Sequence, residues 1–266
     1  MLRLLVTALA CASFLHAVDP QDHVRRSIPV SSATRLVLKA DAGAIRIQPG
    51  GTSSVDIDVY FRGFHEHRDF TLDVKQQGSD IRVNGAFRNG GEWWPFFLGG
   101  GWLREVEYRV MVPEKFNASV ETAGGAISIK DMRGEVEAST SGGGISIERN
   151  SGRVRAHTSG GGIEIQDAMG AIDASTSGGG VNASLLGQPN QECRLYTAGG
   201  SINVSLSKDI HVDLDASTSG GRVWTDFPVA GRGDRHPSEL RTPLNGGGPR
   251  LFLHTSGGGI SIRRTS

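Results

Sequence analysis

Cysteine is nearly absent from this chain of 266 residues, in which only Cys11 and Cys193 occur. Removal of residues 1–17 as a leader would leave Cys193 alone, and a single thiol excludes an internal disulfide. Long apolar runs are also scarce, because no segment after residue 17 approaches the roughly 20 residues that a membrane-spanning helix needs. The fold must therefore be held together by packing and by backbone pairing.

A net charge of either sign is missing as well. The 28 Lys and Arg residues balance the 28 Asp and Glu residues, so the composition gives no indication of a basic surface that binds nucleic acid. Sustained helical periodicity is lacking, and β-branched apolar residues alternate with polar ones instead, as they do in strands. Glycine is in excess, with 38 copies, but without the three-residue period of collagen. These patterns predict an all-β protein.

Residues 1–17 have the features of a secretory signal peptide. Arg3 gives a positive start, and residues 4–15 form an apolar stretch too short to span a bilayer. We expect cleavage after Ala17, with residues 10–12 offering a second cleavage site. Lipidation at Cys11 is disfavoured, because the residues before it make a poor lipobox. The mature protein is therefore expected to be exported to the periplasm, to the cell surface or to the medium.

One octet recurs from residue 122 to the end of the sequence. It reads TAGGAISI from Thr122, TSGGGISI from Thr140, TSGGGIEI from Thr158 and TSGGGVNA from Thr176, eighteen residues apart each time. Two further copies follow at intervals of 21 residues, a last copy begins at residue 255, and a weaker copy begins at residue 40. A fixed period of this length is typical of a repeat architecture.

A second short strand precedes several octets, as in the sequences GEVEAS and GRVRAH. Opposite charges also recur eighteen residues apart, for example at Lys130 and Glu148. We therefore predict a β-solenoid, or β-helix, of stacked rungs of 18 to 21 residues, with residues eighteen apart as vertical neighbours. Alternation along each unit then places apolar residues on the inner face, such as Val136, Ala138, Ile145 and Ile147.

Glycines occupy the bend between the two strands of each unit. The first two positions of the bend are glycine in all seven octets, and we expect them to need a positive φ or a close backbone approach. A phosphate-binding loop is excluded, because a strand and not a helix follows each bend. The threonine that starts each octet is expected to form a ladder of hydroxyl groups. The structural turn glycines are Gly124, Gly125, Gly142, Gly143, Gly160, Gly161, Gly178, Gly179, Gly199, Gly200, Gly220, Gly221, Gly257 and Gly258.

The mature chain divides into two regions. Residues 18–112 form an N-terminal β-strand region that caps and extends the stack, and residues 113–266 carry the Gly-rich repeats. Insertions interrupt the pattern at residues 88–104 and 227–249, and the second is predicted to be a surface loop with one short paired strand inside it. The final strand, around Ile260 and Ile262, is predicted to leave an open sheet edge through which copies would stack into an oligomer.

Exposed aromatic residues are the candidates for binding a partner. The first insertion concentrates Trp93, Trp94, Phe96, Phe97 and Trp102, which form either a hydrophobic plug over the solenoid or an exposed contact patch. Trp224 stands at an outward strand position, where it is either covered by the second insertion or available to stack on a sugar ring. The expected partners are a surface glycan or an envelope protein.

The remaining motifs that resemble functional sites are better explained by chance than by function. His65 and His67 would share one strand face, as a metal pair does, but no third ligand is evident. Residues 232–234 spell Arg-Gly-Asp in an expected loop, a triplet that arises readily by chance in a chain rich in Gly and Arg. The carboxylates of the repeats alternate with Arg and Lys and do not cluster as catalytic acids do. We therefore predict no catalytic residue, no metal and no cofactor.

The octets, the strand EYRVMVP and the closing sequence LNGGGPRLFLHTSGGGISIRR together resemble the bacterial putative-adhesin family of β-strand-repeat domains of unknown function. The resemblance spans about residues 36–264. It implies an exported, Gly-rich, β-helical protein with an adhesin-like role, and it carries over no catalytic residues.

The leading hypothesis is an exported structural and interaction protein without catalysis. Some β-helices are polysaccharide lyases or hydrolases, so a carbohydrate-active enzyme or a glycan-binding protein on the same scaffold is the alternative. A third hypothesis is a subunit of an envelope assembly, joined through the open sheet edge.

Overall fold

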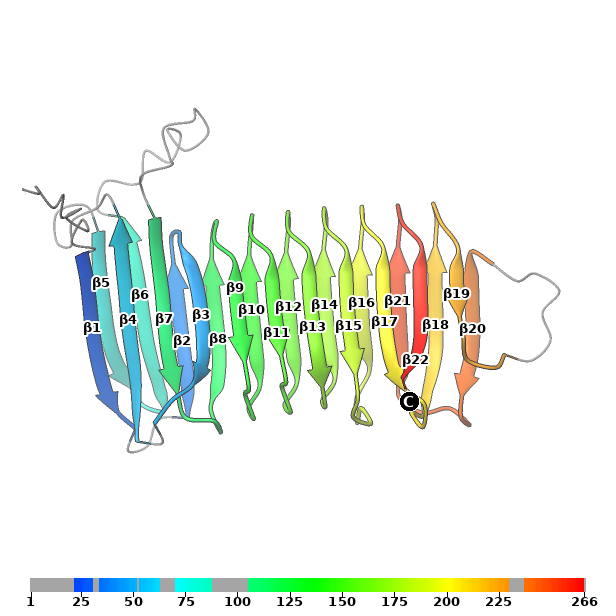
Figure 1. Ribbon diagram of the computed structural model, residues 1–266, viewed down its shortest axis with the longest axis horizontal. Helices are drawn as coiled ribbons and strands as arrows, with labels where there is room; N and C mark the ends of the chain where they lie inside the picture. Colours follow the sequence, from blue (N-terminus) through cyan, green and yellow to red (C-terminus); the bar gives the residue numbers. More distant parts are fainter. Residues whose placement is uncertain are drawn as a thin grey trace, which may run out of the picture.

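The protein consists of two β-sheets that lie face to face along one long axis (Figure 1). The computed structural model describes residues 22–30, 34–51, 53–62, 70–87, 105–229 and 237–265. Within these ranges each sheet has eleven strands and the chain forms no helix. The described residues accordingly contain no helix that is long and apolar enough to cross a membrane. The prediction of an all-β fold is confirmed.

The order of the strands in space differs from their order in the chain. From one end to the other, sheet A contains β1 (Asp22–Pro29), β4 (Ser54–Arg62), β7 (Glu105–Val112), β3 (Ala44–Pro49), β9 (Ile127–Lys130), β11 (Ile145–Glu148), β13 (Ile163–Ala168), β15 (Val181–Leu185), β17 (Ile202–Ser207), β22 (Ile260–Thr265) and β19 (Val223–Thr225). In the same direction, sheet B contains β5 (Phe70–Gln77), β6 (Asp80–Phe87), β2 (Arg35–Ala40), β8 (Asn117–Thr122), β10 (Val136–Thr140), β12 (Val154–Thr158), β14 (Ile172–Thr176), β16 (Cys193–Thr197), β21 (Arg250–Thr255), β18 (Val212–Thr218) and β20 (Glu239–Leu244).

Through the repeat region the chain alternates between the sheets, so that one strand of sheet B and the next strand of sheet A make one rung. β10 and β11 make one rung, and β12 and β13 make the next. Adjacent rungs pair in parallel, with Val136 opposite Val154 and Ile145 opposite Ile163. The prediction that residues eighteen apart become neighbours in adjacent rungs is confirmed for these strands.

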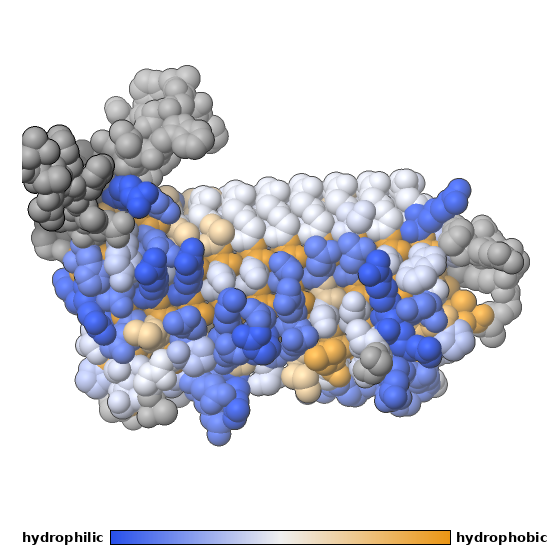
Figure 2. Space-filling view, viewed as in Figure 1, coloured by the Kyte–Doolittle hydropathy of each residue, from blue (hydrophilic) through white to orange (hydrophobic). Residues whose placement is uncertain are grey.

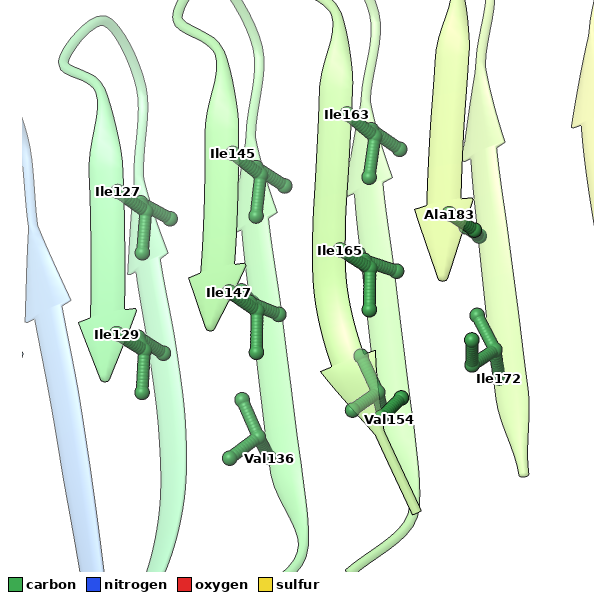
Figure 3. Packing of buried hydrophobic residues seen from close by; sticks show 14 of the residues in the cluster. Ile127, Ile129, Val136, Ile145, Ile147, Val154, Ile163, Ile165, Ile172 and Ala183 are labelled. Atoms are coloured by element: carbon green, nitrogen blue, oxygen red, sulfur yellow. The ribbon is translucent and has the colours of Figure 1, made fainter. Parts of the chain in front are cut away.

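Inward-facing apolar side chains from both sheets form one continuous core. Figure 3 shows Ile145 and Ile163 of sheet A pointing into the space that Val136 and Val154 of sheet B also fill. Burying one such side chain stabilises the fold by about 1.5–3 kcal/mol. Cys193 is a free thiol that packs in the same core.

Charged and polar side chains cover much of the face seen in Figure 2. Lys130 and Glu148 form the ion pair expected from the repeat, at 2.9 Å. Glu137 lies opposite Arg155 in the register, but its ion pair is with Arg35, at 3.4 Å. Exposed pairs of this kind contribute about 0–1 kcal/mol each, so they favour one register more than they stabilise the fold.

The Gly-rich turns of successive rungs lie in one row along the upper margin of Figures 1 and 2. None of the predicted turn glycines has a positive φ. A Cβ on Gly161, the second glycine of its turn, would lie 2.2 Å from the carbonyl oxygen of Gly143 in the preceding rung. The first glycine has more room in the early rungs, since a Cβ on Gly142 would lie 3.7 Å from the nearest atom. Close backbone approach therefore explains the second glycine of each turn.

The threonine that begins each octet is buried and bridges two rungs. The Thr158 hydroxyl donates to the carbonyl oxygen of Gly143 at 2.8 Å and accepts a hydrogen bond from the Gly161 N–H at 3.3 Å. The ladder is thus made of hydroxyl-to-carbonyl bonds. The same bond to a glycine carbonyl of a neighbouring rung is made by Thr122, Thr140, Thr176, Thr197, Thr218 and Thr255.

The N-terminal strands extend both sheets beyond the repeats. In sheet B, β6 pairs in parallel with β2 and antiparallel with β5. In sheet A, β7 pairs in parallel with β3 and antiparallel with β4. The pair β6 and β7 therefore lies between the rung made by β2 and β3 and the outer strands β5 and β4.

The last two strands depart from sequence order. β21 lies between β16 and β18, and β22 lies between β17 and β19. Ile260 pairs with Ile202 on one side and Val223 on the other. The prediction of an open sheet edge at Ile260 and Ile262 is therefore wrong, because strands flank β22 on both sides.

The path of the chain between residues 207 and 250 explains this order. The strands that follow β17 in the chain do not pair with β16 and β17. Instead, β18 and β19 lie one strand position further from the repeats. β20 then pairs antiparallel with β18 at the end of sheet B, and β21 and β22 occupy the position in between. The short strand predicted inside the second insertion is β20, and it caps the sheet.

Candidate binding surface on the outer face of sheet B

The outer face of sheet B changes character along its length. Outward positions in the early rungs carry small or charged side chains such as Ser139 and Glu137, whereas β16 and β21 carry Tyr196, Phe252 and His254 at the equivalent positions. These aromatic residues are half-buried, because each stands among the outward side chains of neighbouring strands. We call the following group the sheet B patch: Asp173, Ser175, Arg194, Tyr196, Arg250, Phe252 and His254.

The aromatic rings of the patch are close to parallel. The ring centroids of Tyr196 and His254 are 5.7 Å apart with an interplanar angle of 14°, and those of Phe252 and His254 are 6.2 Å apart at 13°. The guanidinium groups of Arg194 and Arg250 lie 5.9 Å and 4.9 Å from the centre of the Phe252 ring. Cation–π contacts at exposed sites contribute about 0.5–1 kcal/mol each, so the contacts help to order these long side chains.

A shallow hollow of about 460 Å³ lies over β16. Its walls and floor are formed by Asp173, Ser175, Arg194, Tyr196, Arg250 and Phe252. The volume falls within the range of about 300–1,000 Å³ that is usual for small-molecule sites. The hollow is open to solvent, so it is suited to holding part of a larger ligand.

Each arginine of the patch is held by a carboxylate. Arg194 pairs with Glu192 at 3.3 Å, and Arg250 pairs with Asp215. Asp215 also accepts a hydrogen bond from Arg241 at 3.1 Å. Burial acts to raise the pKa of Asp215, but the hydrogen bonds from Arg250 and Arg241 outweigh it and hold the pKa below its usual value.

Two histidines of this face contact serine hydroxyls. His157 Nδ1 lies 2.9 Å from Ser175 Oγ, and His254 Nδ1 lies 2.9 Å from Ser217 Oγ. Among the described residues, neither imidazole hydrogen-bonds a carboxylate, so the contact that orients the base in a hydrolytic triad is missing. The described ranges also hold no group of three His, Cys, Asp or Glu side chains that could bind a metal. The arrangement is suited to binding through stacking and hydrogen bonds.

The structure places only one of the predicted partner-binding residues. Trp224 lies on β19 of sheet A, opposite Ser261, and its side chain is 41% exposed. It therefore belongs to the other sheet and stands apart from the sheet B patch. Trp93, Trp94, Phe96, Phe97 and Trp102 lie outside the described residues, as do residues 1–17, His65, His67 and the Arg-Gly-Asp triplet at 232–234.

The sequence contains a signal for the sheet B patch outside the octets. When the strands before the octets are aligned, the outward positions read Glu and Ser, Arg and His, or Asp and Ser in three rungs, but Arg and Tyr in β16 and Phe and His in β21. The change to aromatic residues is visible in this alignment. Their juxtaposition is not, because it depends on β21 lying beside β16.

No family model matches the sequence, and no curated protein matches it either. Among solved structures, the chain is similar to a putative cell adhesion protein from Clostridium sporogenes, with 13% identity over 92% of this chain and 100% of that chain and a TM-score of 0.44. It is also similar to a putative adhesin from Bacteroides fragilis (11% identity, 92% and 97% of the two chains, TM-score 0.46) and to a putative lipid binding protein from Parabacteroides distasonis (11%, 92% and 97%, TM-score 0.38).

Proposed function

We propose that the protein is an exported interaction module with an adhesin-like role and without catalysis, and that it binds its partner through the sheet B patch. The observation that carries this proposal is the cluster of aromatic side chains, with two arginines packed against Phe252, on a sheet face whose outward side chains in the earlier rungs are polar or charged. Aromatic and arginine residues are enriched at the centres of protein interfaces and in ligand sites. The signal-like leader at residues 1–17 supports export to the periplasm or the cell surface.

The scaffold that we propose for this role is a β-solenoid. The parallel register between rungs, the shared core and the alternation of the chain between two sheets support it. Each rung buries too few apolar side chains to fold alone, so its strands depend on the rungs on either side. Such a body is stiff along its length and holds surface side chains in fixed positions.

The alternative is a carbohydrate-active enzyme. The two Ser–His contacts of sheet B are the feature that favours it, and the lack of a carboxylate beside either imidazole among the described residues weighs against it. The third hypothesis, an envelope assembly joined at sheet edges, is weakened by the outermost strands at the C-terminal end. β19 has three residues, and β20 contains Pro243, which lacks the N–H that edge pairing needs.

A binding and turnover screen tests the proposal. The purified mature chain is immobilised and exposed to polysaccharides, to envelope proteins and to extracellular-matrix proteins, while each polysaccharide is also assayed for cleavage. We expect binding to at least one of these without cleavage, and loss of binding in the variant Tyr196→Ala/Phe252→Ala. Cleavage that disappears on replacing one Asp or Glu would contradict the proposal and establish the enzyme.

The first insertion provides a second arm of the same screen. Replacement of Trp93, Trp94, Phe96 and Phe97 by Ser leaves binding unchanged if the sheet B patch is the contact surface. Loss of binding with an unchanged β-type circular dichroism spectrum would show that the insertion, and not the sheet B patch, is the contact surface. Loss of the spectrum would identify the aromatic cluster as part of the core.

A further inference from the structure

Tyr196 is flanked very differently on its two sides. On the β21 side its ring stacks on His254. On the β14 side its register partner is Ser175, a short side chain that is itself engaged with His157. On the β14 side Tyr196 therefore faces a short side chain. The hollow over β16 is bordered by Tyr196 and Ser175, and also by Arg250 and Phe252 of β21.

Tyr60 is an outward-facing tyrosine that, unlike Tyr196, has a ring or guanidinium contact with both of its neighbouring strands. It stands outward on β4 in sheet A and stacks on His23 with ring centroids 4.8 Å apart. The guanidinium group of Arg109 lies 4.5 Å from the centre of the Tyr60 ring. Tyr60 thus contacts an imidazole on one neighbouring strand and a guanidinium on the other.

The hollow offers both kinds of hydrogen-bonding group beside the open ring. Asp173 presents a carboxylate acceptor, Arg194 presents donors, and the Ser175 hydroxyl can do both. A pyranose ring matches this arrangement, because its C–H groups form an apolar face that packs on an aromatic ring while its hydroxyls donate and accept at the rim.

The charges of the hollow favour a neutral ligand. Arg194 is paired with Glu192 and Arg250 with Asp215, so neither guanidinium is an unmatched positive charge. Asp173 adds a negative charge in the hollow. It lies in register between Arg155 and Arg194, and Arg153 approaches it to 4.0 Å. An anionic ligand would have to displace one of these carboxylates and would be repelled by Asp173. A neutral ligand with hydroxyl groups can donate hydrogen bonds to the carboxylate and accept them from the guanidinium groups.

We infer that the hollow lined by Tyr196, Ser175 and Asp173 binds a sugar ring of a neutral polysaccharide, with the ring stacked on the open side of Tyr196 and its hydroxyls bound by Asp173 and Arg194. This inference rests on the proposed function, since it names the partner class of the sheet B patch. The hollow is open at its rim, which leaves room for the bound ring to continue into a chain across the sheet.

The test uses the full mature chain on an array of neutral oligosaccharides, uronic-acid oligosaccharides and sulfated oligosaccharides, followed by calorimetric titration with the best neutral binder. We expect neutral oligosaccharides to bind. Tyr196→Ala should weaken the affinity about tenfold, because it removes the stacking platform, whereas Tyr196→Phe should change it less than about threefold. Asp173→Ala should also weaken binding by about tenfold.

Tyr60→Ala is the matched control, since it removes an outward tyrosine stacked on a histidine in sheet A. It should leave the affinity unchanged. Urea unfolding of each variant, followed by circular dichroism, shows whether a loss of binding comes from a loss of folding. Tyr196→Phe keeps the ring and serves as the second check.

Three results would overturn the inference. Binding restricted to the anionic oligosaccharides would refute the neutral class, and binding unaffected by Tyr196→Ala would refute the site. Binding of a protein but of no oligosaccharide, lost in Tyr196→Ala, would refute the inference while leaving the proposed function standing. If the chain bound no oligosaccharide and no protein in the two screens, both the inference and the proposed function would be refuted.

Discussion

Tyr196 and His254 stack on each other with ring centroids 5.7 Å apart, although four strands lie between them in the chain. The contact exists because β21 pairs with β16. In simple sequence order β18 would lie beside β16, and the small side chain of Ser217 would stand where His254 stands. The candidate site is therefore a consequence of how the end of the chain is threaded.

The hydroxyl of Thr158 is predicted to stabilise the junction of two rungs. Thr158→Val keeps the shape of the side chain but leaves the Gly143 carbonyl oxygen and the Gly161 N–H without this partner. The free energy of unfolding should fall by about 1–3 kcal/mol, the usual cost of leaving buried polar groups unpaired. Urea unfolding measures it. Thr158→Ser retains the hydroxyl and Ser159→Ala changes the exposed neighbour, and an equal loss in either would contradict the explanation.

The two glycines of a turn are predicted to respond differently to a methyl group. Gly161→Ala places a Cβ 2.2 Å from the Gly143 carbonyl oxygen, and relief of this overlap should cost about 1–3 kcal/mol. Gly142→Ala meets its nearest atom at 3.7 Å and should change stability by less than about 0.5 kcal/mol. Thermal or urea unfolding of the two variants compares them directly. Similar losses in both would show that close approach is not the reason for the glycines.

Truncation after Pro249 is predicted to abolish cooperative folding of the C-terminal end. The shortened chain lacks β21 and β22, so β18 and β19 lose the strands that join them to β16 and β17. Four strand edges with buried apolar side chains then lie open, and aggregation should follow. Truncation after Ile262 removes only the last residues of β22, beyond its buried apolar side chains, and should stay soluble and folded. Size-exclusion chromatography separates the two outcomes; a monomeric, stable chain ending at Pro249 would contradict the threading.

Asp215 is predicted to contribute stability that depends on pH. Its pKa is lower in the folded chain than its ordinary value, so the contribution is complete above the unfolded pKa of about 3.9 and is lost as the pH falls through the folded pKa. Asp215→Asn should therefore lower the unfolding midpoint at pH 7 and lower it less near pH 2. Asp209→Asn, in an exposed turn, should shift it at neither pH. A deficit for Asp215→Asn that is as large near pH 2 as at pH 7 would show that the carboxylate charge is not its source.

The sequence predicted the local and periodic features of the fold well. The interval between Ile145 and Ile163 places them side by side, because a parallel register fixes vertical neighbours once the period is known. Alternation within a strand likewise identified buried residues such as Val154. These properties depend on neighbouring repeats alone.

The end of the stack and the sheet B patch could not be predicted in the same way. The interval between the last two octets is longer than one rung. Nothing in its sequence indicates that β21 and β22 will lie between β16 and β17 on one side and β18 and β19 on the other. Both orders bury the apolar residues of β21 equally well as far as alternation can tell, since Leu251 and Leu253 face inward in either case. In the observed order the outer edge of β18 pairs with β20, a contact that a repeat pattern does not contain.

Disulfide cross-linking tests this order, on which the candidate site depends, most directly. In a Cys193→Ala background, cysteines replace either Asn203 and Ser261, which are register partners on β17 and β22, or Asn203 and Trp224, which are separated by β22. Adjacent strands are about 4.8 Å apart, within the Cα separation of a disulfide, and alternate strands are about twice as far apart. Mass spectrometry of the oxidised, non-reduced chain should find the first pair linked and the second pair free; a cross-link in the second pair and none in the first would contradict the account.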